Sequence, residues 1–309
     1  MMSQKIVLLR QMLLAAILVL PLVLSAPAEV QAQVTAEVTD EGVEVYVGGD
    51  LFTVYRYGPE LKYPYFYPLN GPVTGQSVTT ESTEPFPHHS SLFFACDRVN
   101  GGNYWQEGLD RGQIDSQTIY LLPEEGESIT FHNRCGWVRP GAPIPFIDHR
   151  TVTISAPTDT LRVIDFTIML EAQIDVTIRK TNHALFSARV VPSLSVEEGG
   201  VMVNSNGQEG EEATFGKEAG WMDYGGMRDG VFEGIAIFDH PENRWHPSPW
   251  FTRNYGFFSP TPMNWLENDQ MTLAEGETLT LRYRVVVHSG NHEEAGLAQL
   301  YEEWASSQP

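Results

Sequence analysis

The chain has 309 residues, of which 40 are acidic and 19 are basic, and its formal net charge is −21. This excess of negative charge argues against nucleic acid and against anionic lipid as partners, because both are bound by basic surfaces. Hydrophobic residues make up 42% of the chain, which is too high for disorder. The length alone allows one large domain or two ordinary ones.

The first residues have the layout of a secretory signal peptide. Lys5 and Arg10 form a basic start, residues 12–24 are almost wholly apolar, and small residues then allow cleavage after Ala32. The alternative is an uncleaved membrane anchor, for which the apolar run is short compared with the ~20 residues that span a bilayer. The sequence therefore predicts a signal peptide at 1–32. The mature chain is expected in the periplasm or outside the cell, with no membrane contact.

Two cysteines, Cys96 and Cys135, follow the predicted signal peptide. An oxidising compartment allows a disulfide between them, and a free, buried Cys96 is an equal alternative. Their spacing matches no zinc or redox motif.

Glycine and proline punctuate the rest of the chain at short intervals, as β-proteins require. Val43, Val45 and Val47, for example, alternate with Glu44 and Tyr46, which gives the period of two that is typical of a strand. Similar patterns predict strands at 34–38, 43–47, 51–57, 91–95, 118–122, 128–132, 151–155, 161–171, 174–180, 185–191, 230–238 and 278–288.

One helix is predicted near the C-terminus. Asn291 and Glu294 form a capping-box pattern, and one apolar stripe at helical spacing follows. The stripe consists of Leu297, Leu300, Tyr301 and Trp304. The predicted fold is all-β, a large antiparallel, supersandwich-like β-sandwich over residues 33–309 that carries a C-terminal α-helix.

A first group of polar and aromatic residues lies in predicted loops of the first third of the chain. Its members are His88, His89, Asp97, Asn100 and Trp105. An aromatic ring beside amides and carboxylates is typical of a sugar pocket, where sugar C–H faces stack on the ring and hydroxyls bond to the polar groups. The alternative is a structured surface turn with satisfied histidines.

A second group lies in a proline-rich loop that follows the strand predicted at 230–238. Its members are His240, Asn243, His246, Trp250, Arg253 and Tyr255. Loops held by a strand scaffold often carry chemistry. The four histidines of the two groups are our acid/base candidates, and the other members are candidate substrate-binding residues. A three-histidine metal site and plain structural hydrogen bonding are the alternatives, and the six-residue spacing of the second histidine pair is not a standard zinc spacing.

His183 and Arg189 lie at the two ends of another predicted strand. An arginine among apolar neighbours needs an anionic partner or a water-facing cleft. That partner is either the carboxylate of an acidic sugar, which makes Arg189 a candidate substrate-binding residue, or an internal Asp or Glu.

Several of these segments resemble the exported PmoA-like proteins, nominally "methane oxygenase PmoA". They include HHSSLFF from His88 and IFDHPEN from Ile237, and the resemblance runs from about residue 45 to the C-terminal helix. It implies a β-sandwich that is often encoded beside carbohydrate-degradation genes. The family usually has Arg after the histidine pair, where this chain has Ser90.

A weaker resemblance, at the level of fold, is to the galactose-mutarotase-like sandwiches, which include sugar epimerases and parts of polysaccharide lyases. It implies a histidine that exchanges a proton with the sugar, opposite a carboxylate or a second histidine.

Three functions follow from these observations. The first is an exported enzyme, a hydrolase, lyase or epimerase, acting on a carbohydrate small molecule or oligosaccharide through its loop histidines. The alternatives are a non-catalytic carbohydrate-binding protein and an oxidoreductase with a histidine cluster holding copper or iron. The sequence has no serine-hydrolase elbow, zincin motif or nucleotide-binding loop, and we expect no cofactor.

Overall fold

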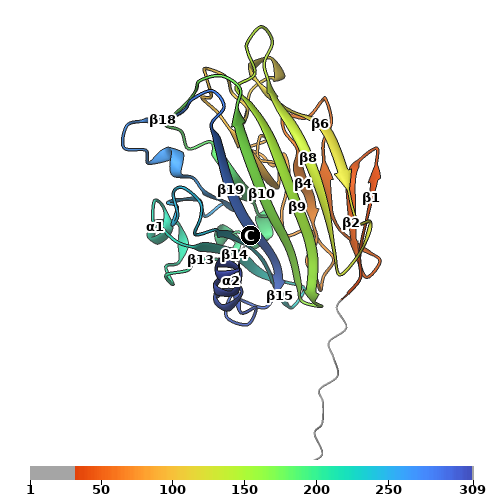
Figure 1. Cartoon of the computed structure of the whole chain (residues 1–309). Helices are drawn as coiled ribbons and strands as arrows, with labels where there is room; N and C mark the ends of the chain where they lie inside the picture. Colours follow the sequence, from red (N-terminus) through yellow and green to blue (C-terminus); the bar gives the residue numbers. More distant parts are fainter. Residues whose placement is uncertain (1–31, 308–309) are drawn as a thin grey trace, which may run out of the picture. The chain divides into compact units, whose positions relative to one another are not determined.

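The computed structural model describes residues 32–307, so the predicted signal peptide lies outside the described residues apart from Ala32. In this part of the chain, long antiparallel strands form two large sheets and one two-stranded ribbon (Figure 1). The described residues fall in one compact unit. The predicted fold class, a large antiparallel β-sandwich with a C-terminal helix, is confirmed.

The first sheet has nine strands, and it carries the candidate site. In spatial order its strands are β16 (Trp250–Thr252), β17 (Phe257–Pro260), β12 (Ala184–Arg189), β5 (Leu92–Cys96), β4 (Tyr65–Leu69), β3 (Asp50–Arg56), β2 (Gly42–Val47), β1 (Val34–Thr39) and β7 (Glu125–Gly126).

The second sheet has eight strands, several of them long. In spatial order they are β13 (Val201–Asn204), β14 (Trp221–Arg228), β15 (Val231–Asp239), β19 (Thr278–Ser289), β10 (Leu161–Ala172), β9 (Phe146–Thr158), β8 (Ser128–Val138) and β6 (Gln113–Leu121).

Short elements complete the described chain. They are the ribbon of β11 (Val176–Arg179) and β18 (Gln270–Leu273), the helices α1 (Gly210–Thr214) and α2 (Leu297–Ser306), and the 3-10 turns η1 (Leu109–Arg111), η2 (Pro192–Leu194), η3 (Val196–Glu198) and η4 (Pro262–Asn264).

The two large sheets pack face to face over one aromatic core. Phe166 on β10 lies 4.8 Å, 6.3 Å and 6.4 Å, between ring centres, from Phe186, Phe94 and Phe66 of the nine-stranded sheet. All four rings are buried, and full burial of one such side chain contributes about 1.5–3 kcal/mol. This core fixes which face of each strand points inward.

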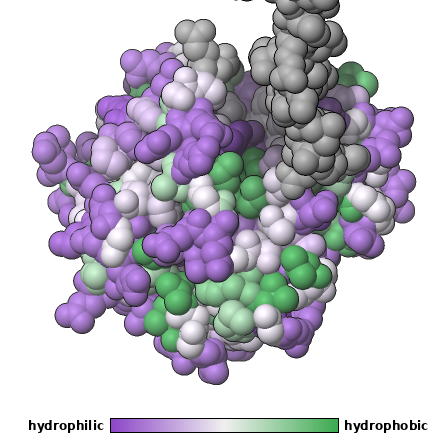
Figure 2. Space-filling model, turned by 90° about the horizontal axis from the view of Figure 1, so that it is seen from below, coloured by the Kyte–Doolittle hydropathy of each residue, from purple (hydrophilic) through white to green (hydrophobic). Residues whose placement is uncertain are grey.

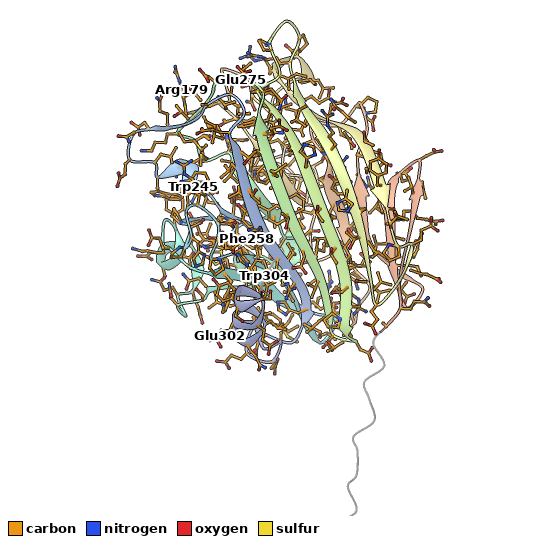
Figure 3. The ribbon with its side chains drawn as sticks, in the orientation of Figure 1. Arg179, Trp245, Phe258, Glu275, Glu302 and Trp304 are labelled. Atoms are coloured by element: carbon orange, nitrogen blue, oxygen red, sulfur yellow. The ribbon has the colours of Figure 1, made fainter. Side chains whose placement is uncertain are left out.

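The C-terminal helix packs on the outer face of the eight-stranded sheet. Leu297 and Trp304 of α2 are buried against Trp221, Phe238 and Val286, which lie on β14, β15 and β19 (Figures 1 and 3). The predicted apolar stripe therefore faces the sheet.

The helix begins later than its capping pattern suggested. Asn291 Oδ1 accepts the amide hydrogen of Glu294, and the Glu294 carboxylate accepts the amide hydrogen of Asn291, as in a capping box. These bonds close a turn at 291–295, and α2 starts only at Leu297, after Gly296 in the left-handed region with φ +66°. The capping pattern therefore marks the turn that aims the helix.

Two further features differ from the expectations or decide between them. The segment Trp221–Arg228, which is not among the predicted strands, is strand β14. Cys96 and Cys135 are both free and buried, which settles the alternative left open for them.

The surface seen from below in Figure 2 is largely hydrophilic, with hydrophobic groups between the polar ones.

Candidate functional site

The candidate site lies on the outer face of the nine-stranded sheet, over β5, β12 and β17. Side chains alternate between the two faces of a strand. Phe186 of β12 points into the core, so Arg189, three residues on, lies on the opposite face. Phe93 of β5 likewise stacks on the outer face, 4.7 Å from Trp105 between ring centres. The loops that cover this face bring the first predicted group together.

Three imidazoles meet there. The ring centre of His88 lies 4.5 Å from that of His89 and 5.9 Å from that of His183. We call His88, His89 and His183 the histidine cluster. The first two come from the loop before β5, and the third immediately precedes β12.

One member of the cluster has a carboxylate partner. Nδ1 of His183 lies 3.3 Å from Oδ2 of Asp97, and Gln106 Nε2 approaches the same nitrogen at 3.5 Å. When Nδ1 carries the ring proton and donates it to Asp97, Nε2 has a free lone pair. This arrangement fixes the tautomer of a histidine that exchanges protons through Nε2.

The other two imidazoles have lowered pKa values. Burial, followed by the charge of His183, lowers the pKa of His88. Burial lowers the pKa of His89 to about 2, with smaller contributions from His88, Arg189 and His183. The His89 ring is stacked between Phe86 and Phe257, at 5.3 Å and 4.4 Å between ring centres, which explains its desolvation. Both rings are therefore neutral at neutral pH.

Buried polar atoms without hydrogen-bond partners are concentrated at this place. Residues 32–307 contain seven such side-chain atoms, and five of them belong to His89, Asp97, Trp105 and Arg189. Because an unsatisfied buried polar group costs about 1–3 kcal/mol, native proteins rarely leave several together without a function. The atoms are His89 Nδ1, Asp97 Oδ1, Trp105 Nε1 and Arg189 Nε and Nη1.

Two partly exposed aromatic rings lie over the buried groups. Phe86 and Tyr255 stack on each other with ring centres 4.8 Å apart. Cζ of Arg189 lies 4.3 Å from the centre of the Tyr255 ring, and Phe86 stacks on His89. The pair therefore separates Arg189 and His89 from solvent.

A hollow of about 870 Å³ opens beside the histidine cluster, and we call it the Asp97 hollow. Its lining includes Asp97, His183, Asn100, Gln106, Arg179 and Gln270. A sugar-sized ligand in this hollow would contact the Asp97–His183 pair directly.

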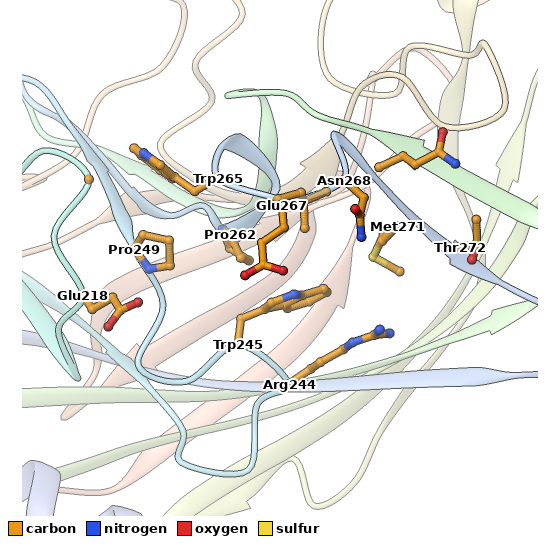
Figure 4. A pocket seen from close by; sticks show the side chains of 13 residues that line it. Glu218, Arg244, Trp245, Pro249, Pro262, Trp265, Glu267, Asn268, Met271 and Thr272 are labelled. Atoms are coloured by element: carbon orange, nitrogen blue, oxygen red, sulfur yellow. The ribbon is translucent and has the colours of Figure 1, made fainter.

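A second hollow, of about 620 Å³, is lined by Trp245, Trp265, Arg244, Glu218, Glu267 and Asn268 among others, and we call it the tryptophan hollow (Figure 4). Gln270 lines both hollows, so the two adjoin. Figure 4 shows the Glu267 carboxylate near the flat indole of Trp245 and the Arg244 side chain on its other side. An aromatic face with carboxylate and amide groups around it suits a sugar ring.

The second histidine pair is not brought into this site. His240 packs on Trp304 of α2, with ring centres 4.8 Å apart, and its Nδ1 accepts the amide hydrogen of Glu242. His246 contacts Asp239 through Nδ1, at 3.3 Å, and Tyr301 through Nε2, at 3.4 Å. Their contacts are with the C-terminal helix and its supporting loop, so these two acid/base candidates have partners within the chain.

Three predicted binding residues of that loop also have structural partners. Asn243 bonds through its side chain to Asp239 and to the backbone of Arg282. Trp250 is fully buried in the core, and its indole N–H donates to the Ala219 carbonyl at 2.9 Å. Arg253 pairs with Glu211 at 3.1 Å and lies between two phenylalanine rings. Of the second group, Tyr255 alone contacts the candidate site.

More members of the first predicted group than of the second lie at the candidate site. Asp97 and both histidines lie at the site, but Trp105 is buried beneath His183, with ring centres 5.6 Å apart, and presents no open face to a sugar. Asn100 lines the Asp97 hollow while its side chain holds the backbone of Asp175 and Thr177.

Two members of the site were not predicted as functional. His183 was noted at a strand end without a catalytic role, and Phe86 was not singled out. The strand pairing that sets Ala184 opposite Cys96 brings His183 to Asp97, and sequence spacing alone contains no trace of that pairing.

The histidine cluster does not fit a metal centre. Within residues 32–307, no group of three or more His, Cys, Asp or Glu side chains is arranged to hold a metal ion. In the same range, no helix combines the length and the apolar character that crossing a membrane requires.

Comparison with protein families places the chain. Residues 42–302 match the model described as "Family of unknown function (DUF6807)". The chain belongs to this family. The resemblance to the PmoA-like proteins rests on the sequence motifs alone. No curated protein matches the sequence.

Several solved structures are remotely similar. An assigned aldose 1-epimerase from Escherichia coli K12 is 12% identical, with a TM-score of 0.34, and the alignment covers 83% of this chain and 98% of that one. A galactose mutarotase related enzyme from Lactobacillus acidophilus is 11% identical over 84% and 97%, with a TM-score of 0.31. A GH36 alpha-galactosidase from Geobacillus stearothermophilus is 9% identical over 84% and 39%, with a TM-score of 0.35. Values this low say nothing about the site.

Proposed function

We propose that this protein is an enzyme that acts on carbohydrates by moving protons at the histidine cluster. The observation that carries the proposal is the contact between Asp97 and His183 at the Asp97 hollow, beside two imidazoles that burial keeps neutral. Hydroxyl-rich ligands suit the unpaired polar atoms that surround the pair.

The residues have separable roles in this proposal. His183, oriented by Asp97, takes a proton from a sugar hydroxyl or carbon through Nε2. The imidazolium that forms on His183 is the acid that returns the proton, and the neutral His88 ring, with its centre 5.9 Å from that of His183, is a second base. His89 is more deeply buried and is a poor base, so it acts as a neutral hydrogen-bonding partner of the ligand.

The groups at the site favour epimerase or lyase chemistry over hydrolysis. Glycoside hydrolysis generally uses two carboxylates on either side of the scissile bond. At the histidine cluster, the carboxylate in contact with an imidazole is Asp97, and the other proton-exchanging groups are imidazoles. Epimerases and lyases need a base and an acid that move one proton each.

We also propose that the enzyme works in the periplasm or outside the cell. The basic, apolar and small-residue segments at the start of the sequence and the motif likeness to exported PmoA-like proteins support this part of the proposal.

The tryptophan hollow supports a second candidate, a non-catalytic carbohydrate-binding protein. Its indole faces and carboxylates suit sugar binding without any proton transfer. In the enzyme proposal the same hollow receives the further residues of an oligosaccharide.

The test is an assay of the purified protein on a panel of oligosaccharides. Epimerisation is followed by deuterium incorporation from heavy water, and elimination by the ultraviolet absorbance of the unsaturated product. His183→Ala should abolish turnover and retain binding, and His240→Ala is the matched control that should retain both. Unchanged turnover in His183→Ala would overturn the proposed mechanism. Binding without turnover on every glycan would favour the second candidate.

A further inference from the structure

Arg189 is a buried arginine without a partner for its charge. Its side chain is 3% exposed, and neither Nε nor Nη1 has a hydrogen-bond partner. An arginine stays charged in proteins, so a buried, unpaired guanidinium carries a large desolvation cost. Something outside the described chain is expected to bind it.

Another buried arginine of the same fold, Arg150, has hydrogen-bond partners for its guanidinium group. Arg150 is 1% exposed, and its Nε and Nη2 donate to the two carboxylate oxygens of Asp148 at 2.9 Å and 3.1 Å, while Nη1 reaches Tyr55 at 3.3 Å. No carboxylate in residues 32–307 lies within ion-pair distance of Arg189, although eight other arginines have one.

The contacts that Arg189 does make cannot replace an anion. Its Cζ lies 4.3 Å from the centre of the Tyr255 ring, and a cation over an aromatic ring gains ~0.5–2 kcal/mol. The neighbouring His89 is neutral and also has an unpaired atom. Glu197 is near enough for its charge to favour the charged form of Arg189, but none of the described acidic residues lies within ion-pair distance of the guanidinium.

We infer that Arg189 binds the carboxylate of an acidic sugar, which makes uronic acids or glycans that contain them the substrate class of the histidine cluster. A carboxylate carries one negative charge, which matches the one guanidinium, and its planar pair of oxygens fits the guanidinium fork. A dianionic phosphate would leave a buried excess charge. The inference rests on the proposed function, because it assigns the ligand of the same site.

The position of Arg189 agrees with this role. The charges of His88 and Arg189 both act on His89, so His89 is near both residues. The His88 ring in turn lies 5.9 Å from the His183 ring, between ring centres. A sugar with its carboxylate at Arg189 would therefore extend toward the proton-exchanging pair. The ligand must pass the Phe86–Tyr255 ring pair, whose members are themselves partly exposed.

The experiment measures binding of galacturonate, galactose and galactose 6-sulfate to the purified protein by calorimetry. Oligomers of galacturonate and galactose serve as a second series if the monosaccharides bind weakly. The wild type should prefer the carboxylated ligand. Arg189→Gln should weaken its binding by roughly 10- to 100-fold and leave galactose binding unchanged. Arg284→Gln, which removes an arginine paired with Asp165 on the other sheet, is the matched control and should change neither.

Folding of the variants is checked by thermal melting. If Arg189→Gln is unfolded, Arg189→Lys keeps the charge without the fork and should lose part of the preference for the carboxylate. Equal binding of galacturonate and galactose by the wild type would overturn the inference, as would a preference for the sulfate or an Arg189 variant that retains the preference.

The result separates this inference from the proposed function. A carboxylate preference that depends on Arg189, in a protein that turns over no glycan, supports the inference and sinks the enzyme. Turnover of neutral glycans that depends on His183 but not on Arg189 supports the enzyme and sinks the inference.

Discussion

Asp97 and His183 face each other at the end of two paired strands, with Oδ2 of the carboxylate 3.3 Å from Nδ1 of the ring. The register of β5 and β12 sets Cys96 opposite Ala184, and the amide of Asp97 donates to the carbonyl of His183 at 3.0 Å. The sheet therefore fixes the backbone of both residues, and the pair needs little ordering of loops. The second carboxylate oxygen is buried without a partner, which leaves it for a ligand.

Asp97→Asn tests this pair. The amide can no longer fix the protonated Nδ1 of His183, so we expect kcat to fall by about 100-fold or more, with KM changed far less. Nitrogen NMR of the His183 ring should show the Nδ1–H tautomer in the wild type and its loss in the variant. This second measurement identifies a positioning role, because a merely structural change would not alter the tautomer.

Retention of the Nδ1–H tautomer and of turnover in Asp97→Asn would contradict the prediction. Arg284→Gln is the control, because Arg284 pairs with Asp165 on the other sheet and contacts neither residue of the pair. It should leave both measurements unchanged.

The strands could be predicted where side chains alternate between a buried and an open face. Those of β1, β2 and β19 were predicted to within one residue at each end, because their apolar residues recur with a period of two. Strand β14 could not be predicted in this way. Six of its eight residues are buried on both faces, and Gly225 and Gly226 imitate a turn.

The sequence predicted which types of residue form the site better than it predicted which individual residues do. The loop after β15 has the composition of a ligand site, but its buried Asp239 already binds Asn243, His246 and the amide of Ser248. A polar loop has the same composition whether its partners belong to the chain or to a ligand. Only the three-dimensional contacts separate the two, and they leave Arg189 unpaired.

His89 should make the protein sensitive to acid. Its pKa is about 2 in the fold and about 6.5 in the unfolded chain. The unfolded chain therefore takes up a proton that the native protein refuses as the pH falls below 6.5, so the stability is present above that pH and is lost toward pH 2. The expected loss is about 1 kcal/mol per pH unit.

His89→Asn provides the comparison, because its amide does not titrate. Urea denaturation at a series of pH values should give a flatter stability profile for the variant between about pH 6 and about pH 4. Parallel profiles for the two proteins would show that His89 is not held neutral by burial.

His288 should have the opposite pH dependence. Burial opposes its charge, but the Asp223 carboxylate, 2.8 Å from Nε2, and the Gly290 carbonyl outweigh burial and raise its pKa. The stability from this pair is therefore fully present below 6.5 and is lost as the pH rises through the raised pKa. His288→Gln should be less stable than the wild type at acidic pH, by about 1–3 kcal/mol, with a gap that narrows in alkali.

The measurement is again urea denaturation across pH, with His132→Gln as the control on an exposed strand position. A gap between wild type and His288→Gln that stays constant from acid to alkali would contradict the assignment of a charged His288.

Trp245 should contribute to the binding of long ligands. It lines the tryptophan hollow, which adjoins the Asp97 hollow through Gln270. Trp245→Ala should weaken binding of an oligosaccharide by about 2- to 10-fold, the effect of one lost aromatic contact, and should not change binding of a monosaccharide. Tyr120→Ala, at an exposed position on β6, is the matched control. Equal weakening for short and long ligands would remove the tryptophan hollow from the binding path.

A comparison of His240→Ala with His183→Ala distinguishes a structural histidine from a catalytic one. The ring is buried on Trp304, and its Nδ1 accepts an amide hydrogen from Glu242, so His240→Ala removes a packing contact and a hydrogen bond under α2. We expect about 1–3 kcal/mol of lost stability in urea denaturation and unchanged turnover per folded molecule. His183→Ala should instead show no turnover per folded molecule. Loss of turnover in a fully stable His240→Ala protein would return the second histidine pair to the active site.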